Sequence, residues 1–455
     1  MLSILLLIIR RSYSASCIVQ IIASLLLVIV GIISNVDPAT RARCEIITIN
    51  PVFKILGRSL VVDVNLKNFI VLLYAFLGAW TTALLIFKVK SRVVPFGLAF
   101  VALTISALAV EPFLYSALII EIAVIVSVIM IADPDIPLNK GLLRYLIYFS
   151  IGMPFVLLAG WYLAGGEITP VSDSQLIQAT LLFGLGFVFW ISVFPFYTWQ
   201  PMVAEENRLS ESMLLLIVLP VVIIMLLLKY LNGFVWLREY EVTYQALRLF
   251  GLIMVITGAL WAYFQKDFKR ILSYLLITSA GEMLIAISLN LPLGVYLSAD
   301  FVFPRFCAFF LISWVCIFLE KQGKNMSLNK MKSLFFESPL LATAVLSSLF
   351  SISCMPLSIS FPIMQTLFGY LSADNMLVFI LTIFSALVIL LVNVKICFLF
   401  ISREEREHQN PSPLSLLEKL FFGIFTIFIL ISGIFPNLYL SWFEKLVAGY
   451  QFLVK

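Results

Sequence analysis

Charge is what this sequence has least of. Only 12% of its 455 residues are charged and 62% are hydrophobic, whereas a soluble domain carries about 25% charged and roughly 45–50% apolar residues. This shortage excludes a soluble enzyme and a disordered chain. Because only lipid solvates that much apolar surface, and a spanning helix needs about 20 apolar residues, we predict an all-α polytopic membrane protein with about 13–14 transmembrane helices.

Histidine and paired cysteines are also scarce. The single histidine, His408, lies in a charged loop, and the six cysteines form no CxxC pair. We therefore expect no metal site, no bound cofactor and no histidine-based acid–base chemistry. The net charge of +5 comes from an excess of Lys and Arg. In a membrane protein such an excess usually reflects the orientation of the chain in the membrane, and it does not indicate a nucleic-acid partner. Because Arg10 and Arg11 follow the apolar segment 2–9, we expect no cleavable signal peptide.

Long apolar runs are what the sequence does have. They do not alternate, which favours helices over a β-barrel. The segment 359–401 is too long for one simple helix and suits two crossings or one broken helix. The longest loop, 35–66, is too short for a soluble domain, so nucleotide or flavin chemistry would belong to a partner. The other predicted crossings are 17–34, 67–87, 93–110, 113–132, 145–165, 177–196, 212–229, 247–264, 271–290, 294–319, 338–355 and 414–435.

Basic residues divide unequally between the two sides when the loops are numbered alternately. The richer side is predicted to be cytoplasmic. It holds Arg10, Arg11, Lys88, Lys90, Arg92, Lys140, Arg144, Arg208, Lys266, Lys269, Arg270, Lys321, Lys324, Lys330 and Lys332, and the other side holds mainly Arg41, Arg43, Lys54, Arg58, Arg238 and Arg248.

A few ionisable residues interrupt the apolar runs. An ionisable side chain at mid-depth in lipid is costly without a partner, so each one is a functional hypothesis. Five are predicted near the middle of a helix, and Lys229 is predicted nearer an end. The five are Glu121, Glu282, Asp300, Arg305 and Lys395.

Four of these residues have specific interpretations. Glu121 is a proton-binding or ion-pairing carboxylate, or it makes a structural hydrogen bond to a neighbouring helix. Asp300 and Arg305 are five residues apart, and a bend at Pro304 would bring them together as a pair. Lys395 is a proton carrier, or it extends to the membrane interface.

A charged run, 265–270, separates two long apolar stretches. Its basic residues Lys266, Lys269 and Arg270 suit a tight cytoplasmic turn. Asp267 is predicted to cap the N-terminus of the helix that starts near Ile271.

Several motifs in order resemble the antiporter-like proton-translocating membrane subunits. These are the L, M and N type subunits of respiratory complex I and their relatives in Mrp cation/proton antiporters and membrane-bound hydrogenases. The segment 194–201, with Pro195 and Trp199, resembles the family signature P-F-H-x-W-L-P. The segment 265–281 resembles Q-x-D-x-K-R-x-L-A-Y-S-S…G and is the most specific match. Weaker matches are Ser59–Val64, Arg305–Phe309 and Cys354–Pro356.

The resemblance implies a fold of about 14 helices with two inverted five-helix repeats, each containing a broken helix. On this chain it divides the sequence into N-terminal helices at 1–110, a first antiporter-like repeat at 111–264, a second at 265–402, and a C-terminal loop and helix at 403–455.

The resemblance also implies a chain of charged residues that carries protons through the membrane centre. Glu121, Lys229 and Arg305 match charged positions of the family, and Lys395 is a candidate for the charge in its last helix. Family lysines fall on three uncharged residues here, Trp190, Val221 and Met364. These cannot exchange a proton, and arginine does not release one.

Two interpretations of this degenerate path compete. In one, protons follow a rerouted path through Glu121, Glu282 and Lys395, with Arg305 as a fixed charge. In the other, which we favour, the chain is a scaffold and electrostatic relay. Either way we predict an integral subunit of a complex I-like or related energy-converting complex in an energy-transducing membrane. Its partners would be other membrane subunits, including antiporter-like paralogues, and peripheral redox or ion-coupling subunits.

Two alternatives to this assignment remain open. One is a subunit of a Mrp-type cation/proton antiporter or a related inorganic-carbon uptake module. The other is an unrelated secondary transporter with an anionic solute near Glu121 and Arg305.

Overall fold

The computed structural model describes Ser3, Leu6 and residues 12–35, 47–48, 52–55, 58–133, 137–164, 173–402 and 414–454. Five residues named above lie outside the described part of the chain, Arg10, Arg11, Arg41, Arg43 and His408, and so does Cys44, one of the six cysteines.

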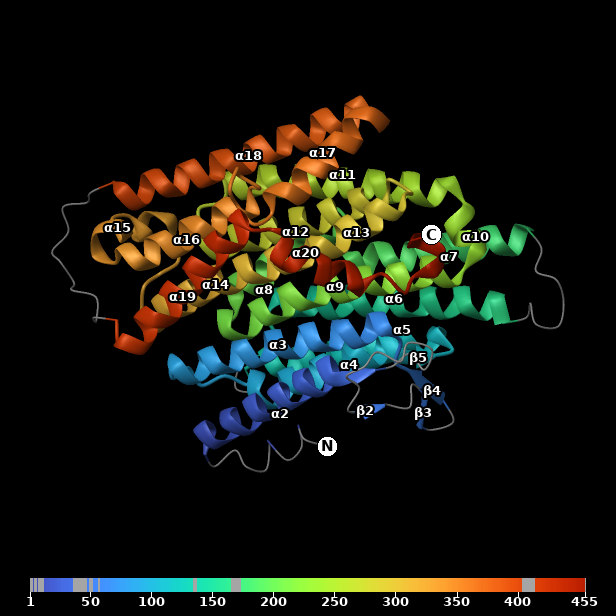
Figure 1. The fold of residues 1–455 in the computed structure, drawn as a ribbon, viewed down its shortest axis with the longest axis horizontal. Coiled ribbons are helices and arrows are strands. Elements are labelled where there is room, and N and C mark those ends of the chain that lie inside the picture. The colour runs from blue at the N-terminus through green and yellow to red at the C-terminus, as the bar shows by residue number, and fades with distance from the viewer. Residues whose placement is uncertain are drawn as a thin grey trace.

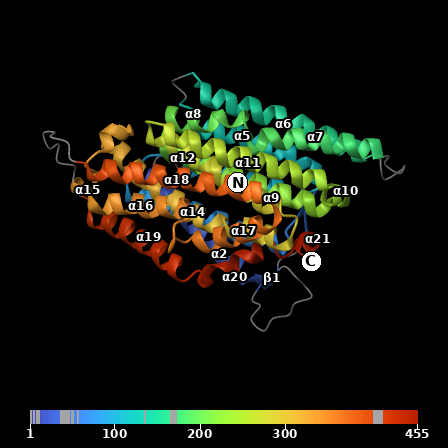
Figure 2. The same cartoon turned by 90° about the horizontal axis from the view of Figure 1, so that it is seen from above.

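The described chain is a bundle of helices that run along one common direction (Figure 1). Seen from above, α6 and α7 form one edge of the bundle, and α19 and α20 lie at the opposite edge (Figure 2). The helices are α2 (Tyr13–Ile33), α3 (Val64–Ile86), α4 (Leu98–Ala109), α5 (Ser116–Ile131), α6 (Lys140–Ala164), α7 (Asp173–Ile191), α8 (Trp199–Glu206), α9 (Leu209–Gly233), α10 (Val235–Glu239), α11 (Glu241–Phe264), α12 (Phe268–Ile287), α13 (Pro292–Asp300), α14 (Val302–Lys321), α15 (Leu334–Glu337), α16 (Pro339–Ile352), α17 (Phe361–Asp374), α18 (Met376–Ile401), α19 (Leu416–Ile434), α20 (Asn437–Phe443) and α21 (Gln451–Val454).

Ten helical segments in the described part are long and apolar enough to cross a membrane. Two of them contain a break, Ser174–Glu206 and Pro292–Lys321. Two shorter apolar helices, Val93–Ala109 and Ser116–Ile131, and the bent segment from Leu328 to Ile352 supply further candidates. Every predicted crossing overlaps one of these helices, and 359–401 contains two, α17 and α18. The prediction of a polytopic all-α membrane protein is confirmed.

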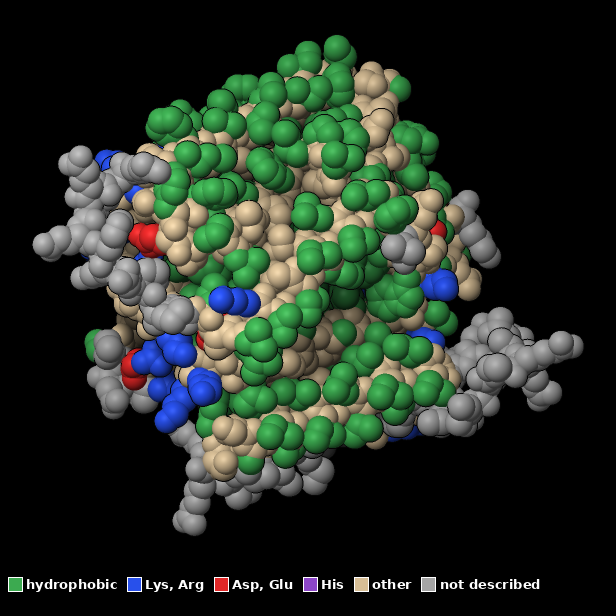
Figure 3. Space-filling model, turned by 60° about the vertical axis from the view of Figure 1, so that its left-hand side comes forward, with side chains coloured by type: hydrophobic (Ala, Val, Ile, Leu, Met, Phe, Trp, Pro, Cys, Tyr) green, Lys and Arg blue, Asp and Glu red, His purple; other side chains and the backbone are tan. Residues whose placement is uncertain are grey.

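Burial separates an inner set of helices from an outer set. The inner helices α9, α12 and α14 are buried along almost their whole length, whereas α2, α18 and α19 expose rows of apolar side chains. Figure 3 shows hydrophobic side chains over most of the visible surface. An apolar outer surface is what a lipid-facing bundle requires, because lipid offers no hydrogen bonds to polar groups.

One end of the bundle gathers the loops that were predicted to be cytoplasmic. Lys321 Nζ donates to the Phe87 carbonyl (2.6 Å), Lys269 pairs with Glu320 (2.7 Å) and the Ser333 amide bonds to Leu399. These contacts bring three of the predicted loops together, and Figure 3 shows a group of Lys and Arg side chains near this end. The cytoplasmic assignment itself stays a prediction.

The opposite end carries the small strands and the end of the chain. Strand β3 (Val52–Ile55) pairs antiparallel with β4 (Arg58–Val61), which pairs antiparallel with β5 (Val110–Glu111). Short strands β1 (Ser34–Asn35) and β2 (Ile47–Thr48) pair in parallel. Asp63 then caps α3, accepting from the Leu66 amide at 2.7 Å. The strand that precedes this helix agrees with the motif at Ser59–Val64.

Close packing of α11 against α12 sets the position of the inner helices. A Cβ atom added at Gly281 would lie 2.8 Å from the carbonyl oxygen of Gly251, and one at Gly258 would lie 3.0 Å from that of Tyr274. Only glycine allows backbones to approach this closely. The contact at Gly281 places the next residue, Glu282, deep inside the bundle.

Candidate functional site

We call residues 111–264 the first half and residues 265–402 the second half. The second half contains a buried ion pair. Arg305 on α14 contacts Glu282 on α12 through its Nη2 atom, and the two side chains are 4% and 3% exposed. A charge at this depth costs several kcal/mol unless it is paired, and each residue here neutralises the other. Because arginine keeps its proton, this pair holds charge at a fixed place rather than carrying it.

Arg305 also contacts the broken helix of the second half. Its Nη1 atom donates to the carbonyl of Ile352, the last residue of α16, at 3.0 Å. Its Nη2 lies 3.9 Å from Cys354 Sγ, just beyond that helix end. A cation at a helix C-terminus is favourable because the unsatisfied carbonyls carry partial negative charge. The guanidinium therefore connects α12, α14 and the end of α16.

The break after α16 has a strained backbone. Cys354 and Leu357 have φ values of 52° and 69°, and neither is a glycine. Residues 353–360 thereby turn the chain from α16 into α17. Conformations of this kind persist only where the surroundings hold them. Arg305 and its partners form part of those surroundings.

Asp300 does not pair with Arg305, contrary to the prediction. It ends α13 and is 6% exposed, and its Oδ1 atom has no hydrogen-bond partner in the described part of the chain. Arg305 lies on the following helix, α14, and its side chain reaches Glu282 instead. The physical reason is that α13 ends at Asp300, so the regular helical spacing between the two residues is interrupted.

The first half has a weaker polar contact. Glu121 on α5 accepts a hydrogen bond from Ser150 Oγ on α6 at 2.5 Å. Its other oxygen is buried and has no hydrogen-bond partner among the described residues. The side chain is only partly buried. This geometry matches the structural interpretation of Glu121, a bond to a neighbouring helix, and leaves its proton-binding role a prediction.

Trp190 stands at a position where the family that the sequence resembles has a lysine. It is 2% exposed, and its indole nitrogen donates to the Phe149 carbonyl at 3.2 Å. A Cβ atom at Gly152 would lie 2.7 Å from the ring. Trp190 thus occupies the space beside α6 as packed indole, which cannot take up or release a proton.

The contact between the two halves is apolar at Val221. Residues 214–219 of α9 are at most 2% exposed, and Val221 is 6% exposed. A cavity of about 20 Å³ is lined by Pro220, Val221, Ser279 and Arg305, among others. This volume holds about one water molecule, and such a water needs two or more polar partners. Met364 on α17 is also buried, at 2% exposure.

Two lysines bind backbone carbonyls near the ends of neighbouring helices. Lys229 donates to the carbonyl of Leu108 near the end of α4 at 2.6 Å, as its predicted position near a helix end implies. Lys395 donates to the carbonyls of Tyr263 and Gln265 at 2.8 and 3.3 Å. These carbonyls mark the C-terminus of α11. Lys395 therefore binds the C-terminal end of α11, and the choice between its two interpretations stays a prediction.

The charged turn at 265–270 connects the halves at one end. Asp267 caps α12 and accepts from the amides of Lys269 (2.8 Å) and Arg270 (3.4 Å), so this prediction is confirmed. Lys269 pairs with Glu320 at 2.7 Å, and Arg270 approaches Glu205 at 3.5 Å. Because Glu205 lies on α8 and Glu320 on α14, the turn joins elements of both halves.

The break in the first half lies at the motif around Pro195. Ser192 has a φ of 61°, and the short 3₁₀ helix η5 (Phe196–Thr198) leads into α8. Trp199 Nε1 donates to Ser192 Oγ at 2.8 Å across this break. Pro195 and Trp199 therefore both lie at the break between α7 and α8.

Sequence reasoning missed several partners. Ser150 and the Ile352 carbonyl bind the two main charged residues, and neither differs from an ordinary helix residue in the sequence. Glu320 had a visible signal, since it stands beside Lys321 at the end of an apolar run. Glu211, in the first turn of α9, is a further acidic residue that is only 4% exposed.

Comparisons with known proteins agree with this architecture. Residues 166–390 match the family model described as NADH:quinone oxidoreductase/Mrp antiporter, TM. Over this stretch, which is just under half of its length, the chain is similar to that family. NADH-quinone oxidoreductase subunit N 2 of Syntrophobacter fumaroxidans is 25% identical over 320 residues, which are 67% of each chain. The Hydrogenobaculum sp. protein of the same name is 25% identical over 331 residues, or 70% of each.

Chains of three solved membrane complexes have a similar fold. A chain of the Mrp complex from Dietzia sp. gives a TM-score of 0.75 at 14% identity, covering 100% of this chain and 95% of that one. A chain of the archaeal membrane-bound sulfane sulfur reductase gives 0.78 at 13% identity, with the same coverage. A chain of respiratory complex I from Thermus thermophilus gives 0.69 at 17%, covering 97% of each.

These similarities support the resemblance that was recognised from the motifs. The chain is an integral, multi-pass membrane protein. The division into two inverted repeats and the roles of individual residues stay predictions.

Proposed function

We propose that this chain is an integral subunit of a complex I-type or related energy-converting complex in an energy-transducing membrane. Support comes from relatives named NADH-quinone oxidoreductase subunit N and from the similarity to chains of multi-subunit membrane complexes. Its partners are other membrane subunits, antiporter-like paralogues among them, and peripheral redox or ion-coupling subunits. Such partners would supply the redox chemistry for which the sequence shows no domain.

Within that complex, the chain acts as a scaffold and a fixed electrostatic element. The observation that carries this proposal is the Glu282–Arg305 pair, held at the end of the broken helix α16. The pair places a buried dipole in the second half, and its arginine does not exchange protons. A change in the charge of a neighbouring subunit would act on this dipole and on the helix break that it holds.

The alternative, a rerouted proton path through this chain, meets a physical obstacle. Protons need titratable groups or water at hydrogen-bond distance. Between Glu121 and the Glu282–Arg305 pair stand Trp190 and the apolar segment of α9 around Val221. The cavity beside Val221 has a volume of about 20 Å³, which is room for about one water molecule.

The first experiment identifies the partner chains. The chromosomally tagged protein is purified in mild detergent, and the co-purifying chains are identified by mass spectrometry. We expect antiporter-like membrane subunits together with peripheral redox subunits. Recovery of the chain as a fully active monomer would overturn the proposal.

A Mrp-type cation/proton antiporter or inorganic-carbon uptake module is the second candidate. The Mrp chain covers this sequence over its full length, with a TM-score of 0.75. This candidate predicts membrane partners without an iron–sulfur or quinone-binding subunit. The same purification therefore separates the two functions.

The second experiment tests the role of the chain inside the complex. Proton flux is measured in liposomes that hold the assembled complex with Glu121→Gln or with the double change Glu282→Gln/Arg305→Met. We expect the first to leave flux within about twofold of normal and the second to lower it while assembly persists. A loss of flux with Glu121→Gln would place that residue in a conducting path, and normal flux with the double variant would leave the chain as scaffold alone.

A further inference from the structure

The outer face of α17 differs from the outer faces of other exposed helices. Five exposed residues follow helical spacing along one side of α17, and we call them the α17 face: Gln365, Thr366, Gly369, Tyr370 and Ala373. On α18 and α19 the exposed side chains are mostly leucine, isoleucine and phenylalanine. The α17 face is instead polar or small, although α17 lies beside α18 at the edge of the bundle (Figure 1).

The α17 face lies at membrane depth. Helices α16 and α17 have 14 residues each and α18 has 26. The hydrogen bond from the Ser333 amide to the Leu399 carbonyl joins the segment before α16 to the end of α18, so the break at 353–360 falls near half the height of α18. Gln365 precedes Asp374, the last residue of α17, by roughly 14 Å of helix. Because half the hydrocarbon thickness is about 15 Å, Gln365 lies near the membrane centre.

The side-chain amide of Gln365 has no hydrogen-bond partner among the described residues. The hydroxyl of the adjacent Thr366, in contrast, donates to the carbonyl of Pro362 within the same helix at 2.9 Å. A hydroxyl that bonds to its own helix can face lipid, but an amide with no partner cannot do so without cost, because lipid offers no hydrogen bonds. The partner of Gln365 therefore comes from outside the described chain.

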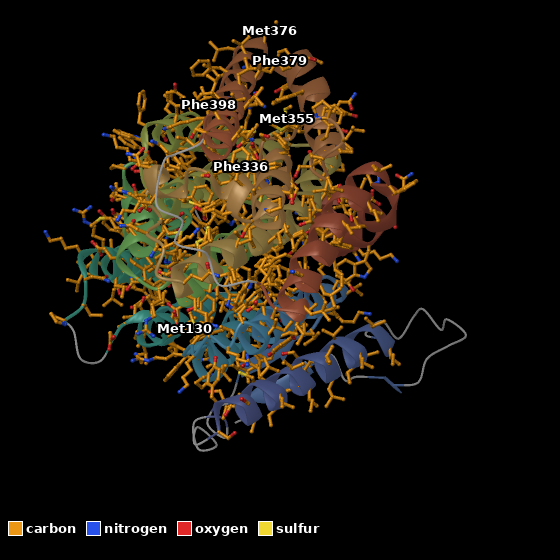
Figure 4. All side chains as sticks on the ribbon, turned by 90° about the vertical axis from the view of Figure 1, so that its left-hand side faces the viewer. Met130, Phe336, Met355, Met376, Phe379 and Phe398 are labelled. Carbon is orange, nitrogen blue, oxygen red and sulfur yellow. The ribbon has the colours of Figure 1, made fainter. Side chains whose placement is uncertain are left out.

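The break just before α17 exposes irregular backbone near the same depth. Leu357 is 75% exposed at a φ of 69°, and its amide has no acceptor among the described residues. In Figure 4, Met355 of the break lies in the same part of the bundle as Met376 and Phe379 of α18. Irregular backbone persists within the hydrocarbon region only where protein or water covers it. The break thus gives the same indication as Gln365.

The shape of the α17 face suits a second helix. Gly369 and Ala373, four residues apart, leave a surface on which another helix backbone can approach closely. Nothing in the described chain uses this space, because a Cβ atom added at Gly369 would meet nothing within 4 Å. The glycines between α11 and α12 differ, since a Cβ atom at Gly281 would lie 2.8 Å from a backbone oxygen. The space at Gly369 is open to a partner.

We propose that the α17 face binds a transmembrane helix of a different membrane subunit, an inference that rests on the proposed function. Helix contacts in membranes use small residues and hydrogen-bonding side chains. The partner helix packs on Gly369 and Ala373 and presents a hydrogen-bonding group to Gln365.

Charge at the end of the α17 face separates a different subunit from a second copy of this chain. Asp374 continues the row of Thr366 and Tyr370, and it is still 44% exposed beside Arg248, at 2.7 Å. In a symmetric pair of copies, two Asp374 carboxylates would lie at the same height, and like charges disfavour that arrangement. A helix with a lysine or arginine at this height fits better.

Photo-crosslinking in the purified, assembled complex tests this proposal. Benzoylphenylalanine replaces Gln365, and adducts are identified by mass spectrometry. We expect one adduct, with a single membrane subunit. An adduct between two copies of this chain, or no adduct in a complex that contains its other membrane subunits, would overturn the proposal. So would rapid labelling of Gln365→Cys by a water-soluble maleimide in the intact complex, because the face would then line water. A preparation without any partner subunit would overturn the proposed function, and this inference with it.

Two substitutions test the contact itself. Gln365→Leu removes the amide, and Gly369→Leu fills the space for the partner helix. Each should lower retention of the crosslinked subunit about tenfold during purification, while the thermal unfolding midpoint of the chain alone stays unchanged. Gly423→Leu is the matched control, because a Cβ atom added at Gly423 of α19 also meets nothing within 4 Å. Equal retention in the Gly369→Leu and Gly423→Leu variants would overturn the proposal.

Discussion

The two halves of this bundle differ in the partners that they provide for ionisable side chains. In the second half, Glu282 and Arg305 form a pair that also holds the end of α16. In the first half, Glu121 meets only a serine hydroxyl, and Trp190 fills the space where the family resemblance places a lysine. A chain can therefore keep the fold of an ion-translocating family while one half retains an ion pair and the other becomes packed core.

The largest effect should come from breaking the pair in the second half. Arg305→Met leaves Glu282 buried without a partner, which should lower the free energy of unfolding by about 3–5 kcal/mol. Adding Glu282→Gln should restore most of this loss, because no uncompensated charge remains. Thermal unfolding of the purified protein in detergent measures both. Equal destabilisation in the single and double variants would show that the pair is not an energetic unit.

Trp190 tests whether the first half is ordinary core. Truncation to alanine removes the ring beside Gly152 and leaves a cavity, so we expect a loss of about 3 kcal/mol. Trp161→Ala is the control, because Trp161 is 69% exposed on the outer surface of α6. The two variants are compared by their unfolding midpoints. Similar small shifts in both would mean that Trp190 contributes no more than a lipid-facing residue.

Asp267 tests the turn between the halves. Asp267→Ala removes the acceptor for the Lys269 and Arg270 amides and should cost about 1 kcal/mol. Asp267→Asn keeps a capping oxygen and should cost less. Hydrogen exchange of the first turn of α12 checks the difference. Unchanged exchange in the alanine variant would argue that the pairing of Phe268 with Met326 alone holds the turn.

The smallest effect is expected at Glu121. Glu121→Gln keeps an acceptor for Ser150 and should change the unfolding free energy by less than about 1 kcal/mol. Glu282→Gln, which leaves Arg305 unpaired, should cost clearly more. The ratio of the two losses in unfolding free energy measures how much more the buried carboxylate of the second half contributes to stability than that of the first half. A larger loss for Glu121→Gln would reverse that contrast.

Local signals predicted much of the fold. Apolar runs located the crossings, because a helix in lipid must be about 20 residues long. Asp267 and the following helix were also visible, since a cap and its helix are adjacent in the sequence. The division at 359–401 was left open, and Asn375 settles it by capping α18 through the amides of Leu377 and Val378.

Long-range choices could not be predicted in the same way. Asp300 is five residues from Arg305, yet the arginine reaches Glu282, which is 23 residues away. That choice depends on how α12 lies against α14, and this in turn depends on the glycine contacts of α11 with α12. Lys395 was ambiguous for the same reason, because its acceptors belong to α11, 130 and 132 residues earlier in the chain.

The sequence by itself determined that this protein lies in a membrane, where its helices run and which loops carry the basic residues. These properties follow from local apolarity and charge, which lipid and water sort without reference to distant residues. The tertiary structure decided which buried charges meet, which helix ends they hold and where a cavity remains. Those outcomes depend on packing between helices that are far apart in the chain. A shift of one helical turn between two such helices would change which side chains meet.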